Sequence, residues 1–176
     1  MQGRRDVVDW ALFVALSFLW ASAFSFTKLA VADLPPRLVI VLRLHLGAAI
    51  LLGALYVSGG ALPSLRDRRR WASMVSMGLV GMTVPFLLVT IGQQTVPSSL
   101  ASLYVAAAPL ITICGVHLFF HDEKLTLRAA MGVAIGFIGV GILLGPSIFN
   151  TTDSGGVWAQ ILCLLGATGY AASNLI

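Results

Sequence analysis

The sequence has few charged residues, and this scarcity excludes several classes of protein. Lysine and arginine contribute 11 residues, aspartate and glutamate 7, so 10% of the 176 positions are charged, where a soluble domain has about 25%. Hydrophobic residues make up 58% of the chain, against roughly 45–50% in such domains. So few charges cannot cover the surface of a water-soluble domain of this size. The composition therefore excludes a soluble enzyme, a disordered chain and a nucleic-acid-binding protein.

Cysteine is also scarce, and the familiar catalytic motifs are missing. Cys114 and Cys163 lie in apolar segments without CxxC spacing, which indicates small buried side chains rather than a disulfide framework or a zinc site. The sequence has no HExxH, GxSxG or phosphate-binding glycine loop. His117 and His121 have a spacing that suits zinc, but no third, distant ligand is evident. We therefore expect no enzymatic activity, no metal and no other cofactor.

The sequence instead contains six long apolar segments, almost back to back. The hydrocarbon core of a bilayer is about 30 Å thick, so a helix that rises about 1.5 Å per residue needs about 20 apolar residues to cross it. Lipid cannot satisfy an open backbone, and the alternating pattern of a β-barrel is missing, so each segment should be a helix. We therefore expect an all-α polytopic membrane helical bundle in a lipid bilayer. The segments are Trp10–Val31, Leu38–Val57, Trp71–Ile91, Leu100–Phe120, Leu127–Leu144 and Val157–Ile176.

Basic residues between the segments predict the orientation. Loops rich in lysine and arginine stay in the cytoplasm, and only Arg37 falls on the opposite side. We expect a multi-pass protein of the cell inner membrane with a cytoplasmic N-terminus. A signal peptide cleaved near residues 21–23 is the alternative for the first segment, but the apolar stretch continues beyond them through Leu29. The basic residues on the cytoplasmic side are Arg4, Arg5, Arg66, Arg68, Arg69, Arg70, Lys124 and Arg128.

Five crossings before the sixth segment indicate a repeat. A second copy of a five-helix unit enters the membrane in the opposite orientation, and such inverted repeats build transporters whose substrate site lies between the halves. We expect residues 1–146 to form the first five-helix repeat, residues 147–156 an outer loop, and residues 157–176 the first helix of a second repeat. Because the chain stops at Ile176, inside the sixth segment, we expect it to be truncated to the first half.

Short motifs occur in a fixed order along these segments. They are Leu19-Trp20-Ala21-Ser22 followed by Lys28, then Arg43, Gly78–Gly81, Ala101–Pro109, His121–Thr126 and Gly132–Gly141. This ordered set resembles the EamA-like members of the drug/metabolite transporter superfamily over nearly the whole chain. The resemblance implies ten helices in two repeats, and export or import of small metabolites, amino acids or drugs across the inner membrane. Helices seven to ten are missing here, so it also implies a partner, either a second half or a homodimer partner.

These features predict a secondary transporter that moves a small organic metabolite or drug by alternating access, for example in efflux. The alternative is a non-transporting protein, either a truncated remnant or a membrane subunit that packs with another half. Small four-helix multidrug exporters couple to protons through a carboxylate deep in the membrane, and no aspartate or glutamate lies well inside any segment here. Any proton coupling would therefore have to use His45, the imidazole near the centre of its segment, or an interfacial carboxylate; a packed, hydrogen-bonded histidine is the alternative.

Two cations inside the segments are candidate substrate-binding residues. A cation at the bilayer centre costs about 2.5–3.5 kcal/mol on insertion scales, so intramembrane charges usually have a function. Lys28 and Arg43 are both expected about 6–8 Å below the outer boundary, where a cationic rim would attract carboxylate-bearing substrates. In the alternative, both side chains extend to the lipid headgroups, or Lys28 pairs with Asp33.

Aromatic residues and prolines supply the other candidates. Trp20 and Tyr104 are polar-tipped aromatic side chains at membrane depth, expected to line a substrate cavity or to pack in the core. Pro85 and Pro109 each remove a backbone hydrogen bond, which produces a hinge, an open carbonyl for a substrate, or a plain kink. A final pattern predicts packing: glycines four residues apart, such as those at 132 and 136, let helix backbones approach closely.

Overall fold

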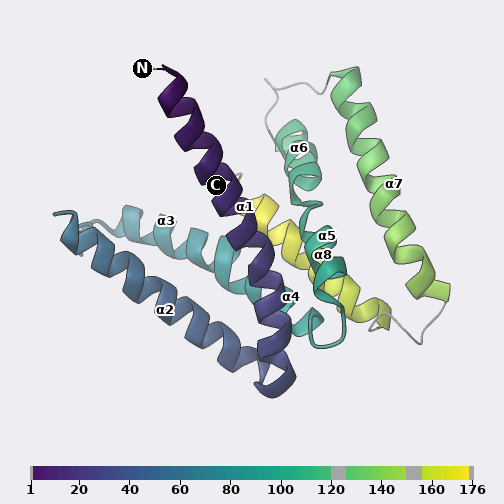
Figure 1. Ribbon diagram of the computed structural model, residues 1–176, viewed down its shortest axis with the longest axis horizontal. Helices are drawn as coiled ribbons and strands as arrows, with labels where there is room; N and C mark the ends of the chain where they lie inside the picture. Colours follow the sequence, from purple (N-terminus) through teal and green to yellow (C-terminus); the bar gives the residue numbers. More distant parts are fainter. Residues whose placement is uncertain (1, 120–125, 150–155, 175–176) are drawn as a thin grey trace.

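The computed structural model describes the backbone of residues 2–119, 126–149 and 156–174, and the side chains of residues 7–117, 126–142 and 156–174. Every regular element in this part of the chain is a helix, which confirms the all-α fold class. Figure 1 shows the arrangement. The elements are α1 (Gln2–Asp33), α2 (Pro36–Val57), α3 (Arg68–Gly78), the π-helical turn η1 (Leu79–Thr83), α4 (Val84–Gly92), α5 (Ser98–Val105), α6 (Ala108–Phe119), α7 (Leu127–Phe149) and α8 (Gly156–Ser173).

Four helical stretches of the described chain are long and apolar enough to cross a membrane: Val7–Asp33, Pro36–Val57, Arg68–Gly92 and Ser98–His117. A shorter apolar stretch covers Leu127–Ile142. These stretches match the first five predicted segments, and the polytopic membrane bundle is confirmed. The expected boundaries shift at three places. The first helix begins at Gln2 rather than Trp10, and α7 continues past residue 146 to Phe149. In the described chain α8 ends at Ser173 and is not among the stretches that are long and apolar enough to cross a membrane.

The third predicted segment contains a π-helical turn between α3 and α4. Pro85 has no N–H group and cannot donate to the carbonyl of Gly81, so the regular pattern of bonds is interrupted just after this turn. The Val84 N–H donates instead to the Leu79 carbonyl, five residues back. The hydroxyl of Thr83 donates to the Gly78 carbonyl at 3.0 Å, which satisfies a second oxygen of the widened turn.

The fourth predicted segment is also divided, at Ala106 and Ala107. The Ala107 N–H donates to the Tyr104 carbonyl at 3.1 Å, and the Leu110 N–H donates to the Ala107 carbonyl at 3.0 Å. Both bonds span three residues, which tightens the backbone between α5 and α6. Pro109 lies in the first turn of α6 and has no N–H to donate. Both predicted proline interruptions are therefore present, one as a π-turn and one as a break.

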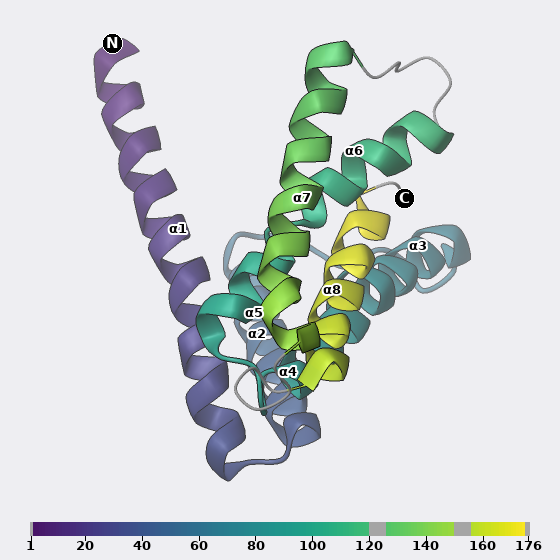
Figure 2. The ribbon, with the colours of Figure 1, turned by 90° about the vertical axis from the view of Figure 1, so that its right-hand side faces the viewer.

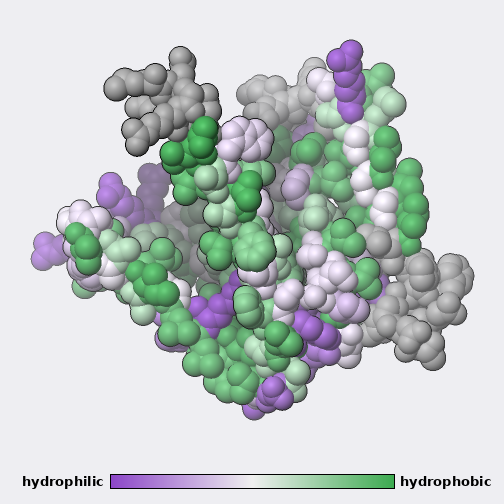
Figure 3. All heavy atoms as spheres, in the orientation of Figure 1, coloured by the Kyte–Doolittle hydropathy of each residue, from purple (hydrophilic) through white to green (hydrophobic). Residues whose placement is uncertain are grey.

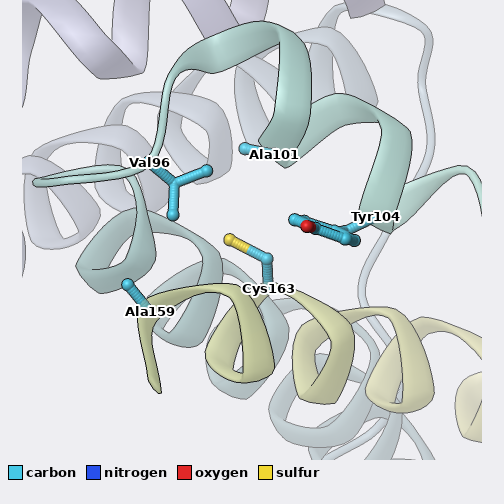
Figure 4. Packing of buried hydrophobic residues seen from close by; sticks show 5 residues of the cluster. All are labelled: Val96, Ala101, Tyr104, Ala159 and Cys163. Atoms are coloured by element: carbon cyan, nitrogen blue, oxygen red, sulfur yellow. The ribbon is translucent and has the colours of Figure 1, made fainter. Parts of the chain in front are cut away.

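The sixth segment, α8, packs among the helices that precede it in the chain. It contacts η1, α4, α5, α6 and α7, and Figures 1 and 2 show it in the middle of the bundle, beside α7. Its residues Ala159 and Cys163 form a buried cluster with Val96, Ala101 and Tyr104, drawn in Figure 4. The core of the described chain therefore lies where α8 meets α4 and α5.

Glycines on both helices allow α4 and α8 to approach closely. A Cβ atom at Gly92 would lie 2.6 Å from Cys163 Sγ and 2.7 Å from the Ala159 carbonyl oxygen. A Cβ at Gly166 would lie 2.6 Å from Val89 Cγ2, and one at Gly169 would lie 2.6 Å from a ring carbon of Pro85. Real Cβ atoms do not occupy such positions. Only glycine fits at these points without moving a helix.

The predicted glycine pair of α7 behaves differently. A Cβ at Gly132 would meet nothing within 4 Å, whereas one at Gly136 would meet the side chain of Leu110 on α6. The described chain thus has a side-chain contact at Gly136 and open space at Gly132, and the predicted close approach of helix backbones stays a prediction. One face of α7 lies open because the described chain places no helix against it.

Large apolar side chains remain exposed over much of the described surface, and Figure 3 shows them on the visible face. In Figure 2 the N-terminal half of α1 stands apart from the other helices, and its side chains from Val7 to Ala21 are all exposed. A water-soluble protein rarely exposes such large apolar areas. This surface suits lipid and further helices, as expected for a chain of the composition described above.

Candidate functional site

Three cavities lie between the described helices. The first, called here the arginine cavity, has a volume of about 190 Å³ and is lined by α1, α2, α4 and α8. The second, the serine cavity, has about 680 Å³ and is lined by α1, α5, α6 and α8. The third, the α2–α3 cavity, has about 600 Å³ and is lined by α2, α3, η1 and α4. Hydroxyl groups of Ser17, Ser102 and Ser173 give the serine cavity its name.

The three cavities adjoin through shared side chains. Trp20, Phe24 and Tyr170 line both the arginine cavity and the serine cavity. Arg43 and Phe86 line both the arginine cavity and the α2–α3 cavity. The arginine cavity therefore adjoins both of the larger ones.

Arg43 is held over an aromatic ring at the edge of the arginine cavity. Its guanidinium carbon lies 4.2 Å from the centroid of the Phe86 ring, within the range of a cation–π interaction. Its Nη1 donates to Thr27 Oγ1 at 3.3 Å, and that hydroxyl donates to the Ala23 carbonyl at 2.7 Å. Phe86 in turn contacts Tyr170 edge-on, with 5.9 Å between ring centroids. Residues of four helices thus fix one cation.

Lys28, the residue after Thr27, has different partners from Arg43. Its Nζ donates to the carbonyl oxygens of Gln93 at 2.7 Å and Gln94 at 3.1 Å, directly after the last residue of α4. A cation stabilises the carbonyl end of a helix. The Gln93 side chain returns a bond from Nε2 to the Phe24 carbonyl at 2.8 Å. Lys28 therefore fastens α1 to α4, an arrangement outside both sequence alternatives for this residue, and it lines none of the three cavities.

Tyr104 lies in the packed core. Its side chain is fully buried in the cluster of Figure 4, and its hydroxyl donates to Gln160 Oε1 at 2.6 Å. It lines none of the three cavities. Its position matches the packed alternative considered for this residue rather than the cavity-lining one.

Trp20 and Pro109 do line cavities. Trp20 borders the arginine and serine cavities, and Pro109 borders the serine cavity just after the break between α5 and α6. His45 is exposed on α2, and its Nδ1–H donates to the Val41 carbonyl at 2.7 Å, so it is hydrogen-bonded as in the alternative but is not packed in the described chain. Of the five predicted site residues, the structure brings Trp20, Arg43 and Pro109 to adjoining cavities, and Lys28 and Tyr104 to contacts between helices. Their role with a substrate stays a prediction.

Sequence reasoning missed several residues that shape this region: Thr27, Phe86, Gln93, Gln160 and Tyr170. Gln160 carried a usable signal, because an amide inside an apolar segment needs an internal partner. Gln93 follows an apolar helix and resembles an ordinary loop residue in the sequence. The proposed histidine pair is not tested, since His121 lies outside the described residues.

Comparison with known proteins agrees with this architecture. Residues 10–145 match the EamA-like transporter family. The chain belongs to this family. The resemblance found in the motifs is thereby confirmed, and the protein is a transporter-family membrane protein.

Individual relatives carry related descriptions. An uncharacterized inner membrane transporter of Escherichia coli, YedA, is 33% identical over 94% of this chain and 51% of its own length. An uncharacterized transporter of Bacillus subtilis, YoaV, is 25% identical over 92% of this chain and 54% of its own. A chloroplastic WAT1-related protein of Arabidopsis thaliana is 23% identical over 90% of this chain and 37% of its own. The chain thus spans about half the length of the first two, and no solved structure matches it.

Proposed function

We propose that this chain forms half of a secondary transporter that moves a small organic solute across the cell membrane by alternating access. The observation that carries the proposal is the row of adjoining cavities around α1, α4 and α8, with a single cation at its centre. Family membership supports transport in general. A second half, or a second copy of this chain, completes the enclosure on the exposed side of α1.

Two interruptions of the helices supply candidate hinges beside these cavities. The π-turn η1 and Pro85 precede the part of α4 that lines the arginine cavity. The break at Ala106 borders the serine cavity. Helix breaks of this type let one part of a transporter helix move relative to another. We assign them to the change between outward-open and inward-open states.

A cytoplasmic N-terminus is part of the proposal and follows from the basic loops. Cysteines introduced at Leu34, between α1 and α2, and at Ala61, between α2 and α3, are expected to lie on opposite sides; both positions are exposed. A membrane-impermeant maleimide should label Leu34→Cys in intact cells and Ala61→Cys only after permeabilisation. Cys114 is replaced by alanine in both variants, whereas Cys163 is fully buried and is kept. Labelling of Ala61→Cys alone in intact cells would reverse the orientation.

Transport itself is tested by counterflow in proteoliposomes that contain the chain. A panel of radiolabelled organic anions, amino acids and cations should include at least one solute that exchanges faster than in protein-free liposomes. Trp20→Ala should slow that exchange about two- to tenfold, the effect of losing one aromatic contact. Trp158→Ala is the matched control, because Trp158 is exposed on α8 and lines none of the three cavities.

The outcome separates the transporter from the alternative function. Exchange that depends on Trp20 but not on Trp158 supports a solute path through the cavities. If no solute in the panel exchanges, the chain is instead a non-transporting subunit that packs with another half, and the transport proposal fails for this chain alone. If Trp20→Ala and Trp158→Ala slowed the exchange equally, the solute would not pass through these cavities.

A further inference from the structure

Among the described residues that line the arginine cavity and the serine cavity, one is charged: Arg43, which lines the arginine cavity. The remaining side chains that line them are neutral. No described carboxylate forms an ion pair with Arg43, and the nearby cation Lys28 is directed to backbone carbonyls at the end of α4. The described side chains that line the two cavities therefore carry a net charge of +1. A solute that carries one negative charge would neutralise it.

The contacts of Arg43 leave most of its hydrogen-bonding capacity available. A guanidinium group has five N–H donors, and the described residues accept one bond, from Nη1 to Thr27. Phe86 occupies one face of the guanidinium plane, which leaves donors at its edge. Two parallel N–H groups at that edge match the two oxygens of a carboxylate. The geometry suits a carboxylate better than a hydroxyl or an amide.

Aromatic side chains determine what else the solute should contain. The arginine cavity, at about 190 Å³, is a little larger than the roughly 150 Å³ apolar cavity that holds one benzene molecule. Trp20, Phe24 and Tyr170 separate it from the serine cavity, which offers about 680 Å³ more. Rings stack well on such a wall. A positively charged solute would instead meet Arg43 without a compensating carboxylate, which disfavours it.

We propose that the arginine cavity binds a small organic monoanion, with its carboxylate on Arg43 and an apolar or aromatic body against Trp20, Phe24 and Tyr170. This inference rests on the proposed transport function and names its class of solute. Lys28 takes no part in holding the anion, because its ammonium is bonded to the carbonyls of Gln93 and Gln94.

Binding of three probes that share one ring tests the proposal: 3-phenylpropionate, 3-phenylpropanamide and 3-phenylpropylamine. The full chain is placed in lipid nanodiscs, and dissociation constants are measured by calorimetry at low ionic strength. The anion should bind about tenfold or more tighter than the neutral amide, as expected for a hydrogen bond to a charged group, and the amine should bind weakest. Arg43→Gln should remove the preference for the anion. Arg43→Lys should keep part of it, because the charge remains but the paired donors are lost.

Arg37→Gln is the matched control. It removes the same charge from the same helix, but Arg37 lines none of the three cavities, so the preference for the anion should persist. An equal loss in Arg37→Gln and Arg43→Gln would mean that α2 attracts anions by its overall charge, and would overturn the proposal. So would equal binding of the amide and the anion, or no binding of any probe. The comparison of probes on the unmodified chain needs no variant, so poor folding of Arg43→Gln does not obscure it.

The outcomes also separate this inference from the transport proposal. Counterflow of a neutral or cationic solute, together with no Arg43-dependent binding of 3-phenylpropionate, would leave transport intact and remove the anion site. Arg43-dependent binding of 3-phenylpropionate without counterflow of any solute would leave the anion site intact and remove transport by this chain.

Discussion

Replacing Gly92 with alanine is expected to lower the free energy of unfolding by about 1–3 kcal/mol, and replacing it with leucine should prevent folding. The added Cβ would lie 2.6 Å from Cys163 Sγ and 2.7 Å from the carbonyl oxygen of Ala159. The thiol group can turn aside, but the carbonyl belongs to the backbone of α8. Relief of the contact therefore requires α4 and α8 to separate, which disturbs the buried cluster around Cys163. The loss of stability is measured as a fall in the melting temperature of the Gly92→Ala protein in detergent, relative to the wild type.

Gly132→Ala is the control for this prediction. It makes the same chemical change inside a helix, but nothing lies within 4 Å of the new Cβ. Alanine has a higher helix propensity than glycine by about 1 kcal/mol, so this variant should be as stable as the wild type or slightly more so. If both variants lost stability equally, the close approach of α4 and α8 would not be a determinant of the fold.

These glycines show where sequence reasoning about packing stops. The spacing of Gly132 and Gly136 predicted a close helix contact in α7, and of the two glycines only Gly136 has a near neighbour, the side chain of Leu110. Close approaches to the backbone of another helix lie instead at Gly92 on α4 and Gly166 on α8, which are not four residues apart on one helix. The spacing of glycines along a helix identifies a helix face against which another helix could pack. Which helix lies there depends on tertiary contacts that no local pattern contains.

The helices themselves were more accessible to prediction. The thickness of a bilayer sets the length that a crossing helix needs, and apolar segments of about that length predicted the first five helical stretches. Both interruptions follow from prolines that lack an N–H. The form of each interruption did not follow. The turn η1 widens to a π-helix, and the Thr83 hydroxyl donates to the Gly78 carbonyl just before it, whereas the chain near Pro109 tightens into three-residue bonds. These outcomes depend on how the flanking helices pack, and proline alone does not determine them.

The candidate site was predicted in part, for a similar reason. Residue type and membrane depth selected Lys28, Arg43 and Tyr104 as unusual. Their partners are distant in sequence: Lys28 reaches a carbonyl 65 residues away, and Tyr104 reaches a side chain 56 residues away. A polar group in an apolar segment must find a partner, but the sequence does not say whether that partner is backbone, side chain or substrate. For Lys28 the partner is the end of a helix, and for Tyr104 it is an amide.

Tyr104→Ala is expected to lower the free energy of unfolding by about 3–5 kcal/mol, as other large-to-small changes of buried aromatic residues do. The side chain is fully buried among Val96, Ala101, Ala159 and Cys163, so its removal leaves a void between α5 and α8. Tyr104→Phe keeps the ring and loses the bond to Gln160, at a cost of about 0.5–1.5 kcal/mol. Thermal unfolding in detergent gives both values.

The phenylalanine variant separates a packing role from a substrate contact. If Tyr104 only packs in the core, Tyr104→Phe should exchange solute as fast per folded protein as the wild type does, since Tyr104 lines none of the three cavities. Tyr56→Phe removes the same hydroxyl from an exposed position on α2 and should change neither stability nor exchange. A Tyr104→Phe protein with an unchanged melting temperature and lost exchange would assign the hydroxyl to the substrate. The path for the solute would then pass between α5 and α8, through what is now the core, because the hydroxyl lies there against Gln160.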